Sequence, residues 1–349
     1  MRISLITFHN ALNYGAMLQA YATYAVLNKL GHYVEIIDYR IPDYAGIVTK
    51  LVCFVRRLYS NRFINKYYPC KSRHYRTLEE LRENPPKSDC YIVGSDQVWN
   101  VDITKHTYLG FFLDFGSADT LRYAFSSSFG GESINLTKTQ KIEIKRCLKR
   151  FNGIALREAT GIKICQKEFD VEPNSEVVLD PTMLLEDEYN KMVGDVKEKK
   201  QILVYKLNFT SAFDRVAKHI AQSLNLKLAM VGRVLPQKGY KYIYPTDPIN
   251  WLKDIKSSKL ILTDSFHGVV FSILLNKRFV AFCGNPQRVD RLYNLLGLFG
   301  LEDRLCDNPE NLDYALAIAQ KDIDYSCVDS TLKKLRQKSI DILKMFVAK

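Results

Sequence analysis

The sequence predicts an α/β protein made of two halves, each with its own parallel sheet. Short apolar segments typical of buried strands alternate with segments whose apolar residues recur at helical spacing, beginning with a β-α-β unit within residues 3–39. The alternation stops at the polar residues 186–201 and then starts again. We therefore expect an N-terminal domain at 1–190, a C-terminal domain at 191–329 and an amphipathic C-terminal helix at 330–349.

The composition indicates a globular protein that meets an anionic partner. The 349 residues are 47% hydrophobic, and no apolar run approaches the roughly 20 residues of a membrane span. The eight cysteines are scattered without a C-x-x-C pair, which favours a reduced cytoplasmic protein without structural zinc. The net charge of +12 predicts an acidic substrate or an anionic membrane surface as partner. Nucleic acid is the least favoured partner, because no nucleic-acid-binding motif is present.

Three segments between the main elements are harder to assign. Residues 50–76 form a basic, aromatic insertion, either an amphipathic helix that contacts anionic lipid or glycan or a solvated helical insertion. Residues 177–182 are expected to form a strand closed by a proline turn, and residues 186–201 a linker. The sequence leaves both interpretations of the basic insertion open.

One stretch, residues 259–282, combines a strand, a tight turn and a helix. Ser265 is a plausible N-cap of that helix, and His267 would lie in the first turn, at the carboxyl end of a strand where open α/β sheets bind ligands. Gly268 permits close approach of a ligand or of another chain segment, and Asp264 either orients His267 or caps the turn. A lone histidine is more often a core or capping residue, but this one lies beside a helix N-terminus that attracts anions.

Polar residues follow two predicted strands of the first half. Asn13, Tyr14 and Gly15 lie in a loop between a strand and a helix that lacks the G-x-G-x-x-G pattern, so no dinucleotide is predicted. Ser95 and Asp96 follow a second strand and are expected at the same rim of the sheet. Both Asn13 and Asp96 are equally compatible with ordinary turn formation.

Three cations are candidates for binding an anion. Arg157 ends a short strand of the first half, and Lys206 ends the first strand of the second half, where a surface lysine is equally plausible. Arg288 follows the strand that ends at Phe282, although Arg-Asp pairing on a helix face explains it equally well. No acidic cluster suits a divalent ion, so we predict neither a metal nor a cofactor.

Together these motifs resemble the polysaccharide pyruvyl transferases. The resemblance covers roughly residues 1–298, and five signatures occur in the order of the family: Asn13-Tyr14-Gly15-Ala16, Val93-Gly94-Ser95-Asp96-Gln97-Val98-Trp99, Leu156-Arg157-Glu158, Asp180-Pro181 and Thr263-Asp264-Ser265-Phe266-His267-Gly268. It implies a GT-B-like fold, in which two Rossmann-like domains with parallel sheets face one another across a cleft. It also implies transfer of a pyruvyl group from phosphoenolpyruvate to paired sugar hydroxyls as a ketal.

The resemblance assigns roles to the candidate residues. Arg157 and His267 match the arginine and histidine of the family motifs and are expected to be catalytic. The other expected contacts are divided between the donor (Asp264, Ser265, Gly268, Lys206 and Arg288) and the substrate side of the N-terminal domain (Asn13, Tyr14, Gly15, Ser95 and Asp96).

The expected acceptor is a hexose of a surface or capsular polysaccharide or of its lipid-linked precursor. The expected location is the cytoplasm, with peripheral association at the inner face of the membrane if the acceptor is lipid-linked. Two alternatives remain open. A nucleotide-sugar-dependent glycosyltransferase has the same architecture, and a non-catalytic protein that binds anionic glycans is suggested by the net charge.

Overall fold

The computed structural model divides into two compact units. The first unit comprises Met1–Gly46, Ser60–Leu185 and Lys334–Lys349, and the second comprises Ile47–Tyr59 and Glu186–Lys333. The structure describes residues 1–41, 53–174, 176–185, 187–232, 235–244, 246–283 and 289–348.

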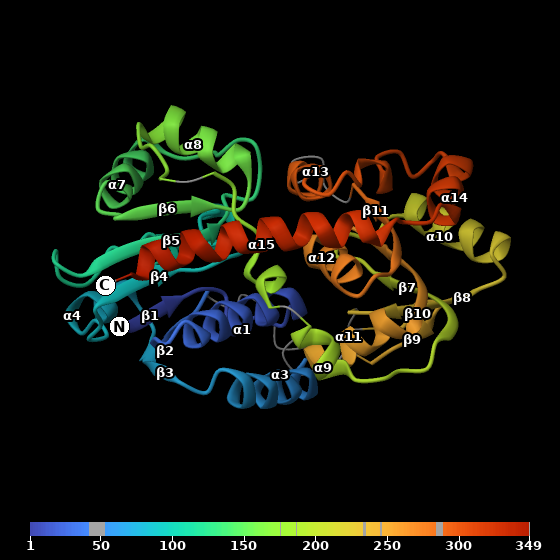
Figure 1. The fold of residues 1–349 in the computed structure, drawn as a ribbon, viewed down its shortest axis with the longest axis horizontal. Helices are drawn as coiled ribbons and strands as arrows, with labels where there is room; N and C mark the ends of the chain where they lie inside the picture. Colours follow the sequence, from blue (N-terminus) through green and yellow to red (C-terminus); the bar gives the residue numbers. More distant parts are fainter. Residues whose placement is uncertain are drawn as a thin grey trace. The chain divides into compact units, whose positions relative to one another are not determined.

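The first unit is built on a parallel sheet whose described strands have the order β3-β2-β1-β4-β5-β6 (Figure 1). These strands are β1 (Arg2–Ile6), β2 (Tyr33–Tyr39), β3 (Lys71–Tyr75), β4 (Cys90–Val93), β5 (Leu121–Ser127) and β6 (Gly153–Leu156). The helices with residues in this unit are α1 (Tyr14–Lys29), α3 (Phe54–Tyr67), α4 (Leu78–Glu83), α5 (Val101–Thr104), α6 (Tyr108–Phe111), α7 (Lys138–Leu148), α8 (Ala159–Phe169) and α15 (Tyr325–Val347), with the 3-10 turns η1 (Lys105–Thr107) and η2 (Pro181–Leu184).

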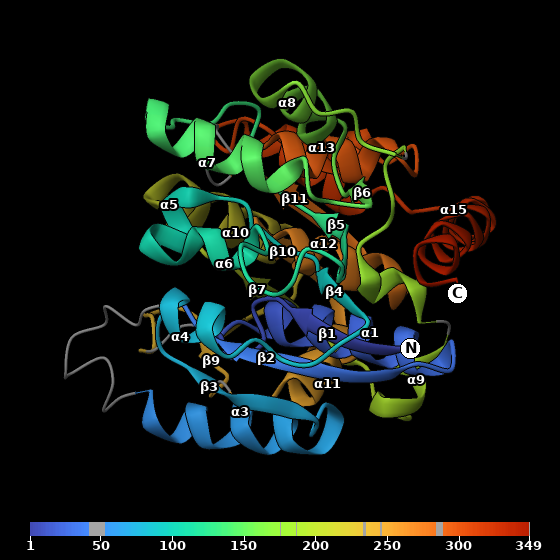
Figure 2. The same cartoon turned by 90° about the vertical axis from the view of Figure 1, so that its left-hand side faces the viewer.

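The central strands of this sheet are apolar because helices cover both of its faces (Figure 2). Trp99 lies at the centre of the core on one side, where its ring stacks on Phe112 at 5.1 Å and its indole N–H donates to the Phe111 carbonyl at 3.0 Å. Arg122 is buried beneath the same segment, and its guanidinium donates to the carbonyls of Leu113 and Phe115. Because its guanidinium donates to backbone carbonyls, Arg122 holds this segment in place and is not a candidate for ligand binding.

The second unit repeats this design. Its described strands have the order β12-β11-β10-β7-β8-β9, again parallel. They are β7 (Lys199–Tyr205), β8 (Lys227–Val231), β9 (Lys241–Tyr242), β10 (Ser258–Thr263), β11 (Arg278–Phe282) and β12 (Leu305–Cys306). Besides the first parts of α3 and α15, this unit contains the helices α9 (Glu188–Val193), α10 (Ser211–Ser223), α11 (Pro248–Ser257), α12 (Phe266–Leu274), α13 (Asp290–Gly297) and α14 (Leu312–Gln320), with the 3-10 turn η4 (Glu302–Arg304).

Counted from its own first strand, each sheet has the order 3-2-1-4-5-6. The direction in which the chain winds reverses between β1 and β4 in the first unit and between β7 and β10 in the second. Loops that follow neighbouring strands diverge at such a reversal and leave room for a ligand at the carboxyl ends of the strands. The topology therefore places one candidate site in each unit.

The predicted α/β class with two parallel sheets is confirmed, and most predicted elements lie within a few residues of their expected bounds. The predicted strand at 177–182 is wrong: Val178 donates one backbone bond to Leu156 beside β6, and Pro181, which has no N–H, then begins η2. The predicted linker at 186–201 contains α9, whose Tyr189 and Val193 are buried. The basic insertion forms α3 and then β3, a polar edge strand that was not predicted.

Within the described residues, no helix is long and apolar enough to span a bilayer.

The carboxyl-terminal part of α15 completes the core of the first unit. Phe346 stacks on Tyr123 of β5 at 4.8 Å and is 3% exposed. A Cβ atom at Gly153 would lie 2.6 Å from the Phe346 ring, so β6 and α15 approach each other as closely as a glycine permits. The Ser339 hydroxyl accepts from the Leu179 N–H at 3.0 Å and ties the segment before η2 to the same helix.

We expect Phe346→Ala to lower the free energy of unfolding by about 3–5 kcal/mol, because it removes a buried ring and leaves a cavity. Urea unfolding of the full chain measures this effect. Met345→Ala is the matched control, because Met345 directly precedes Phe346 in α15 and is 59% exposed. This substitution should lower the free energy of unfolding by about 0.5 kcal/mol or less. Equal losses from the two variants would contradict the packing described here.

Candidate functional site

The carboxyl ends of β7 and β10 lie side by side at the winding reversal of the second unit. Tyr205 and Thr263 are partners in the parallel ladder, and the Thr263 hydroxyl donates to the Tyr205 carbonyl at 2.6 Å. The same hydroxyl accepts from the Ser265 N–H at 3.1 Å. One side chain therefore holds two strand ends and the turn that leads into α12.

The N-terminus of α12 is capped as the sequence predicts. The Ser265 hydroxyl accepts from the Gly268 N–H at 3.3 Å. His267 occupies the first turn, is 6% exposed and lies edge-on to the Phe266 ring at 5.3 Å. A Cβ atom at Gly268 would lie 2.2 Å from the Thr263 hydroxyl oxygen, so glycine is required for α12 to begin this close to β10.

Asp264 shapes the neighbouring loop. Its two carboxylate oxygens accept from the N–H groups of Leu207 and Asn208 at 2.8 and 2.9 Å. The loop after β7 is thus fixed to the turn after β10. Asp264 therefore holds the loop after β7 in place. Its predicted role in orienting His267 stays a prediction.

Lys206 is the buried cation of this rim. It is 8% exposed, and its ammonium lies 3.9 Å from the centre of the Phe213 ring and 5.4 Å from that of Phe282. Burial lowers the pKa of Lys206 from 10.5 to about 8, and attraction to Asp264 and to the thiols of Cys283 and Cys306 offsets only part of this effect. A poorly solvated ammonium at a winding reversal is suited to bind an anion.

A different network occupies the rim of the first unit. Arg157 is 4% exposed, and its guanidinium donates to Glu158 at 2.8 Å and to Asp180 at 3.0 Å. Asp180 also accepts from the Ser95 hydroxyl at 2.7 Å. Burial alone would lower the pKa of Arg157, but the attraction of Glu158, Asp180 and Asp96 outweighs it and the pKa is raised. The guanidinium is held in place by carboxylates of its own unit.

Two rim residues beside Arg157 have left-handed backbone conformations. Asp96 has a φ of 75° and Ser126 a φ of 61°, values that are uncommon for residues other than glycine. Asp96 pairs with Ser127 of the neighbouring strand, and its carboxylate accepts from the Gln97 N–H at 2.8 Å. Strained backbone of this kind is frequent at binding and catalytic sites. The half-buried Asp96 carboxylate is consequently a candidate ligand contact.

The loop before α1 is tied to its helix. The Asn13 side chain accepts from the Ala16 N–H at 3.1 Å, so Asn13 is the N-cap of α1. Tyr14 and Gly15 are buried in the first turn. Their predicted substrate contacts stay predictions, as does that of Asn13.

The structure brings the predicted site residues together in two groups, one in each unit. Ser95, Asp96 and Arg157 share the rim of the first sheet, and Asn13, Tyr14 and Gly15 lie at the start of α1 in the same unit. Lys206, Asp264, Ser265, His267 and Gly268 share the rim of the second sheet. Arg288 lies outside the described residues. Asp180 and Thr263, which hold these rims, were not assigned a role from sequence, although each lies within a quoted motif.

Metal binding is a separate question. Within the parts of the chain that the structure describes, no group of three or more His, Cys, Asp or Glu side chains could hold a metal ion.

We expect Gly268→Ala to destabilise the protein by about 1–3 kcal/mol, because the added methyl group overlaps the Thr263 hydroxyl. Thermal melting measures the loss, which should shrink in a Thr263→Ala background. Gly297→Ala in α13 is the control, since the nearest atom to its Cβ, a Glu302 oxygen, is 3.5 Å away. A melting temperature of Gly268→Ala equal to that of the unmodified protein would refute the close approach.

A second prediction concerns the pH dependence of stability in the absence of ligand. The folded state binds the Lys206 proton less tightly than the unfolded state, so between pH 8 and 10.5 the unfolded state holds more protons and the contribution of Lys206 to stability rises with pH. At pH 7 we expect Lys206→Met to be more stable by on the order of 3 kcal/mol.

Urea unfolding at pH 7, 8, 9 and 10 measures this difference, which should decrease above pH 8. Lys227→Met, at the exposed end of β8, should show no such trend. A difference that stays constant over this range would show that Lys206 does not titrate there.

Comparison with known proteins adds independent information on family and fold. The family model described as "Polysaccharide pyruvyl transferase" matches residues 13–283. No curated protein sequence matches the chain.

Several solved structures have the same fold. The UDP-GlcNAc 2-epimerase from Neisseria meningitidis bound to UDP-GlcNAc has a TM-score of 0.57 at 11% identity, and the match covers 99% of this chain and 100% of that one. The UDP-GlcNAc 2-epimerase from Methanocaldococcus jannaschii has a TM-score of 0.55 at 12% identity, over 97% and 99% of the two chains. An alpha-glucosyltransferase in complex with UDP-glucose and DNA has a TM-score of 0.50 at 10% identity, over 99% and 95%.

At these identities the structural matches establish the fold alone, and this is the GT-B fold of the sequence-based prediction. The family model covers most of the chain and includes both rims described above. The chain therefore belongs to the polysaccharide pyruvyl transferase family.

Proposed function

We propose that the protein transfers a pyruvyl group from phosphoenolpyruvate to paired hydroxyls of a hexose, forming a pyruvate ketal on a surface or capsular polysaccharide or on its lipid-linked precursor. Membership of the family supports the reaction type. The observation that carries the proposal for the donor is Lys206, a buried ammonium at the same strand ends as the N-terminus of α12.

The donor has two anionic groups, a phosphate and a carboxylate. Lys206 offers a positive charge that is poorly solvated, and the N-terminus of α12 offers the positive end of a helix dipole capped by Ser265. An anion bound next to Lys206 offsets the free-energy cost of burying its charge. Anion binding is therefore more favourable here than at a lysine that is already solvated by water. Asp264 and Gly268 contribute by fixing the loops on either side.

The chemistry requires balanced proton transfer. A proton is added to the methylene carbon of phosphoenolpyruvate, two sugar oxygens form bonds to C2, and the C2–O bond to phosphate breaks. Of the two hydroxyl protons released, one balances the new methyl group and the other leaves with phosphate. We assign the proton transfer to His267, which lies in the first turn of α12.

We assign the acceptor to the first unit. Asp96, with its strained backbone and half-buried carboxylate, is the proposed contact for a sugar hydroxyl, together with Ser95 and the loop of Asn13. Arg157 belongs to the catalytic machinery in this proposal, and its bonds to Glu158 and Asp180 support a role in holding the Ser95 turn. The reaction uses acid-base and anion-binding groups, so we propose that it needs no cofactor and no metal ion.

We place the reaction in the cytoplasm. All eight cysteines lie in described parts of the chain and are free thiols, as is usual in a reducing compartment.

The test is a thermal-shift titration of the purified protein with phosphoenolpyruvate, UDP-sugars and CDP-sugars. A ligand that binds only the folded state stabilises it, by about 2.7 kcal/mol at 100 times its Kd. We expect phosphoenolpyruvate to raise the melting temperature and Lys206→Met to abolish this rise. Lys227→Met should retain it.

The acid-base role is tested with His267→Ala, using His219→Ala in α10 as the matched histidine control. His267→Ala should retain the donor-induced shift in large part, but lose ketal formation when acceptor glycans are screened by NMR of the ketal methyl group. Arg157→Lys is preferable to Arg157→Ala, because removing the cation would leave Glu158 and Asp180 buried without it. A shift with a nucleotide sugar and none with phosphoenolpyruvate would make the protein a glycosyltransferase.

A further inference from the structure

Helix α3 has one buried side and one exposed side. Its buried positions include Arg56, Ser60, Phe63 and Ile64, and within the first unit the Tyr21 ring of α1 lies 6.4 Å from that of Phe63. At about 100° per residue, the exposed positions fall within roughly 140° of the helix circumference. We call these positions the outer face of α3: Phe54, Val55, Leu58, Asn61, Arg62, Asn65 and Lys66.

The outer face begins with three exposed apolar side chains. Phe54 is 60% exposed, Val55 43% and Leu58 46%. Elsewhere in the described structure, large apolar side chains that are exposed occur no more than once in any helix. Single exposed apolar residues need no explanation, whereas a cluster on one face indicates an interaction surface.

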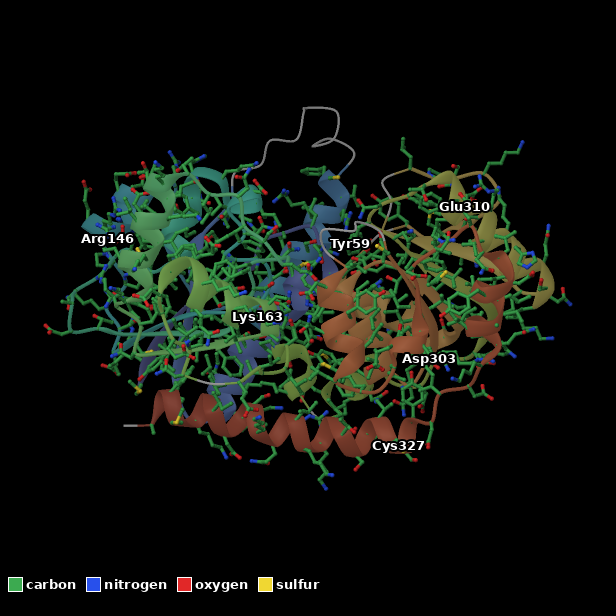
Figure 3. The ribbon with its side chains drawn as sticks, turned by 90° about the horizontal axis from the view of Figure 1, so that it is seen from above. Tyr59, Arg146, Lys163, Asp303, Glu310 and Cys327 are labelled. Atoms are coloured by element: carbon green, nitrogen blue, oxygen red, sulfur yellow. The ribbon has the colours of Figure 1, made fainter. Side chains whose placement is uncertain are left out.

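The charge of the surrounding segment restricts the partner. Residues 53–76 contain seven cations and no aspartate or glutamate: Arg56, Arg57, Arg62, Lys66, Lys71, Arg73 and Arg76. Figure 3 marks this helix by Tyr59, and both Figure 1 and Figure 2 show α3 next to the edge strand β3, which contributes Lys71 and Arg73. The apolar cluster is thus continuous in sequence with a strongly basic segment.

We propose that the outer face of α3 is a docking surface for an anionic lipid bilayer. A bilayer offers an apolar layer for Phe54, Val55 and Leu58 and negative headgroups for Arg62 and Lys66 at the same time. A nucleic acid or an acidic glycan would engage the cations and leave Val55 and Leu58 in water. A second copy of this chain would bring two basic segments together and repel itself.

Docking on a bilayer would bring the protein to the lipid-linked acceptor of the proposed function, and to that extent the inference rests on that function. Vesicle binding can be tested without it. The full-length protein is sedimented with vesicles of phosphatidylcholine alone and of equal parts phosphatidylcholine and phosphatidylglycerol. We expect binding to the anionic vesicles only, weakening as salt is raised.

Two variants test the outer face directly. Each cation beside an anionic surface contributes about a fivefold gain in binding, so Arg62→Gln with Lys66→Gln should weaken it about 25-fold. Phe54→Ser with Leu58→Ser should weaken it roughly tenfold or more, because both side chains leave the bilayer. Both double variants replace exposed residues, and unchanged melting temperatures would show that they fold.

Matched controls separate the surface from general charge. Lys333→Gln with Lys334→Gln removes the same net charge from exposed positions of α15, and Ile142→Ser removes an exposed apolar residue of α7. Neither should change vesicle binding by more than about twofold. Insertion itself is read from Phe54→Trp, because both native tryptophans, Trp99 and Trp251, are 1% exposed. Brominated lipid should quench the introduced tryptophan and leave the native ones unchanged.

Three results would overturn the proposal: no binding to anionic vesicles at low salt, equal loss of binding in the α15 control, or tighter binding to DNA or to a sulfated glycan than to vesicles. The phosphoenolpyruvate-induced thermal shift, measured in the same α3 variants, should be unchanged. A failed donor titration with intact vesicle binding would refute the proposed function and leave this surface in place.

Discussion

The hydroxyl of Thr263 is the point on which the second rim depends. It joins the end of β7 to the end of β10, receives the backbone of the turn and leaves so little room that α12 must begin with glycine at position 268. The position of His267 in the first turn of α12 follows from that contact. Several residues of the motif at 263–268 therefore have structural roles. Thr263, Ser265 and Gly268 allow α12 to begin close to β10.

The two units have the same topology, but the buried cations at their rims, Arg157 and Lys206, have different surroundings. In the first unit, the buried cation Arg157 is paired with the carboxylates of Glu158 and Asp180. In the second, Lys206 lies against aromatic rings, and attraction to Asp264 and to the thiols of Cys283 and Cys306 offsets only part of the effect of its burial. The proposed function rests on this contrast, since it assigns the charged donor to the second unit and the sugar to the first.

The sequence was sufficient for the alternation of strands and helices and for the capped turn at Ser265, because both depend on residues close together in the chain. The sequence could not predict the hydrogen bonds of Arg157, because its partners are distant in the chain. Ser95 is 62 positions away, and Asp180 is 23 positions away. Burial of Lys206 was equally hidden, because a lysine after a strand has the same local pattern whether it meets water or Phe213. The strand β3 was missed for a related reason: an edge strand needs few apolar residues.

The first unit takes its last piece of core from residues 334–349, more than 140 positions after β6 and η2 have been made. During synthesis, β5 and β6 are made long before Phe346, because residues 186–333 of the second unit come between them in the chain. Until then, Tyr123 and Gly153 lack the ring that covers them in the folded unit. The first unit can therefore complete its core only after most of the second unit has been made.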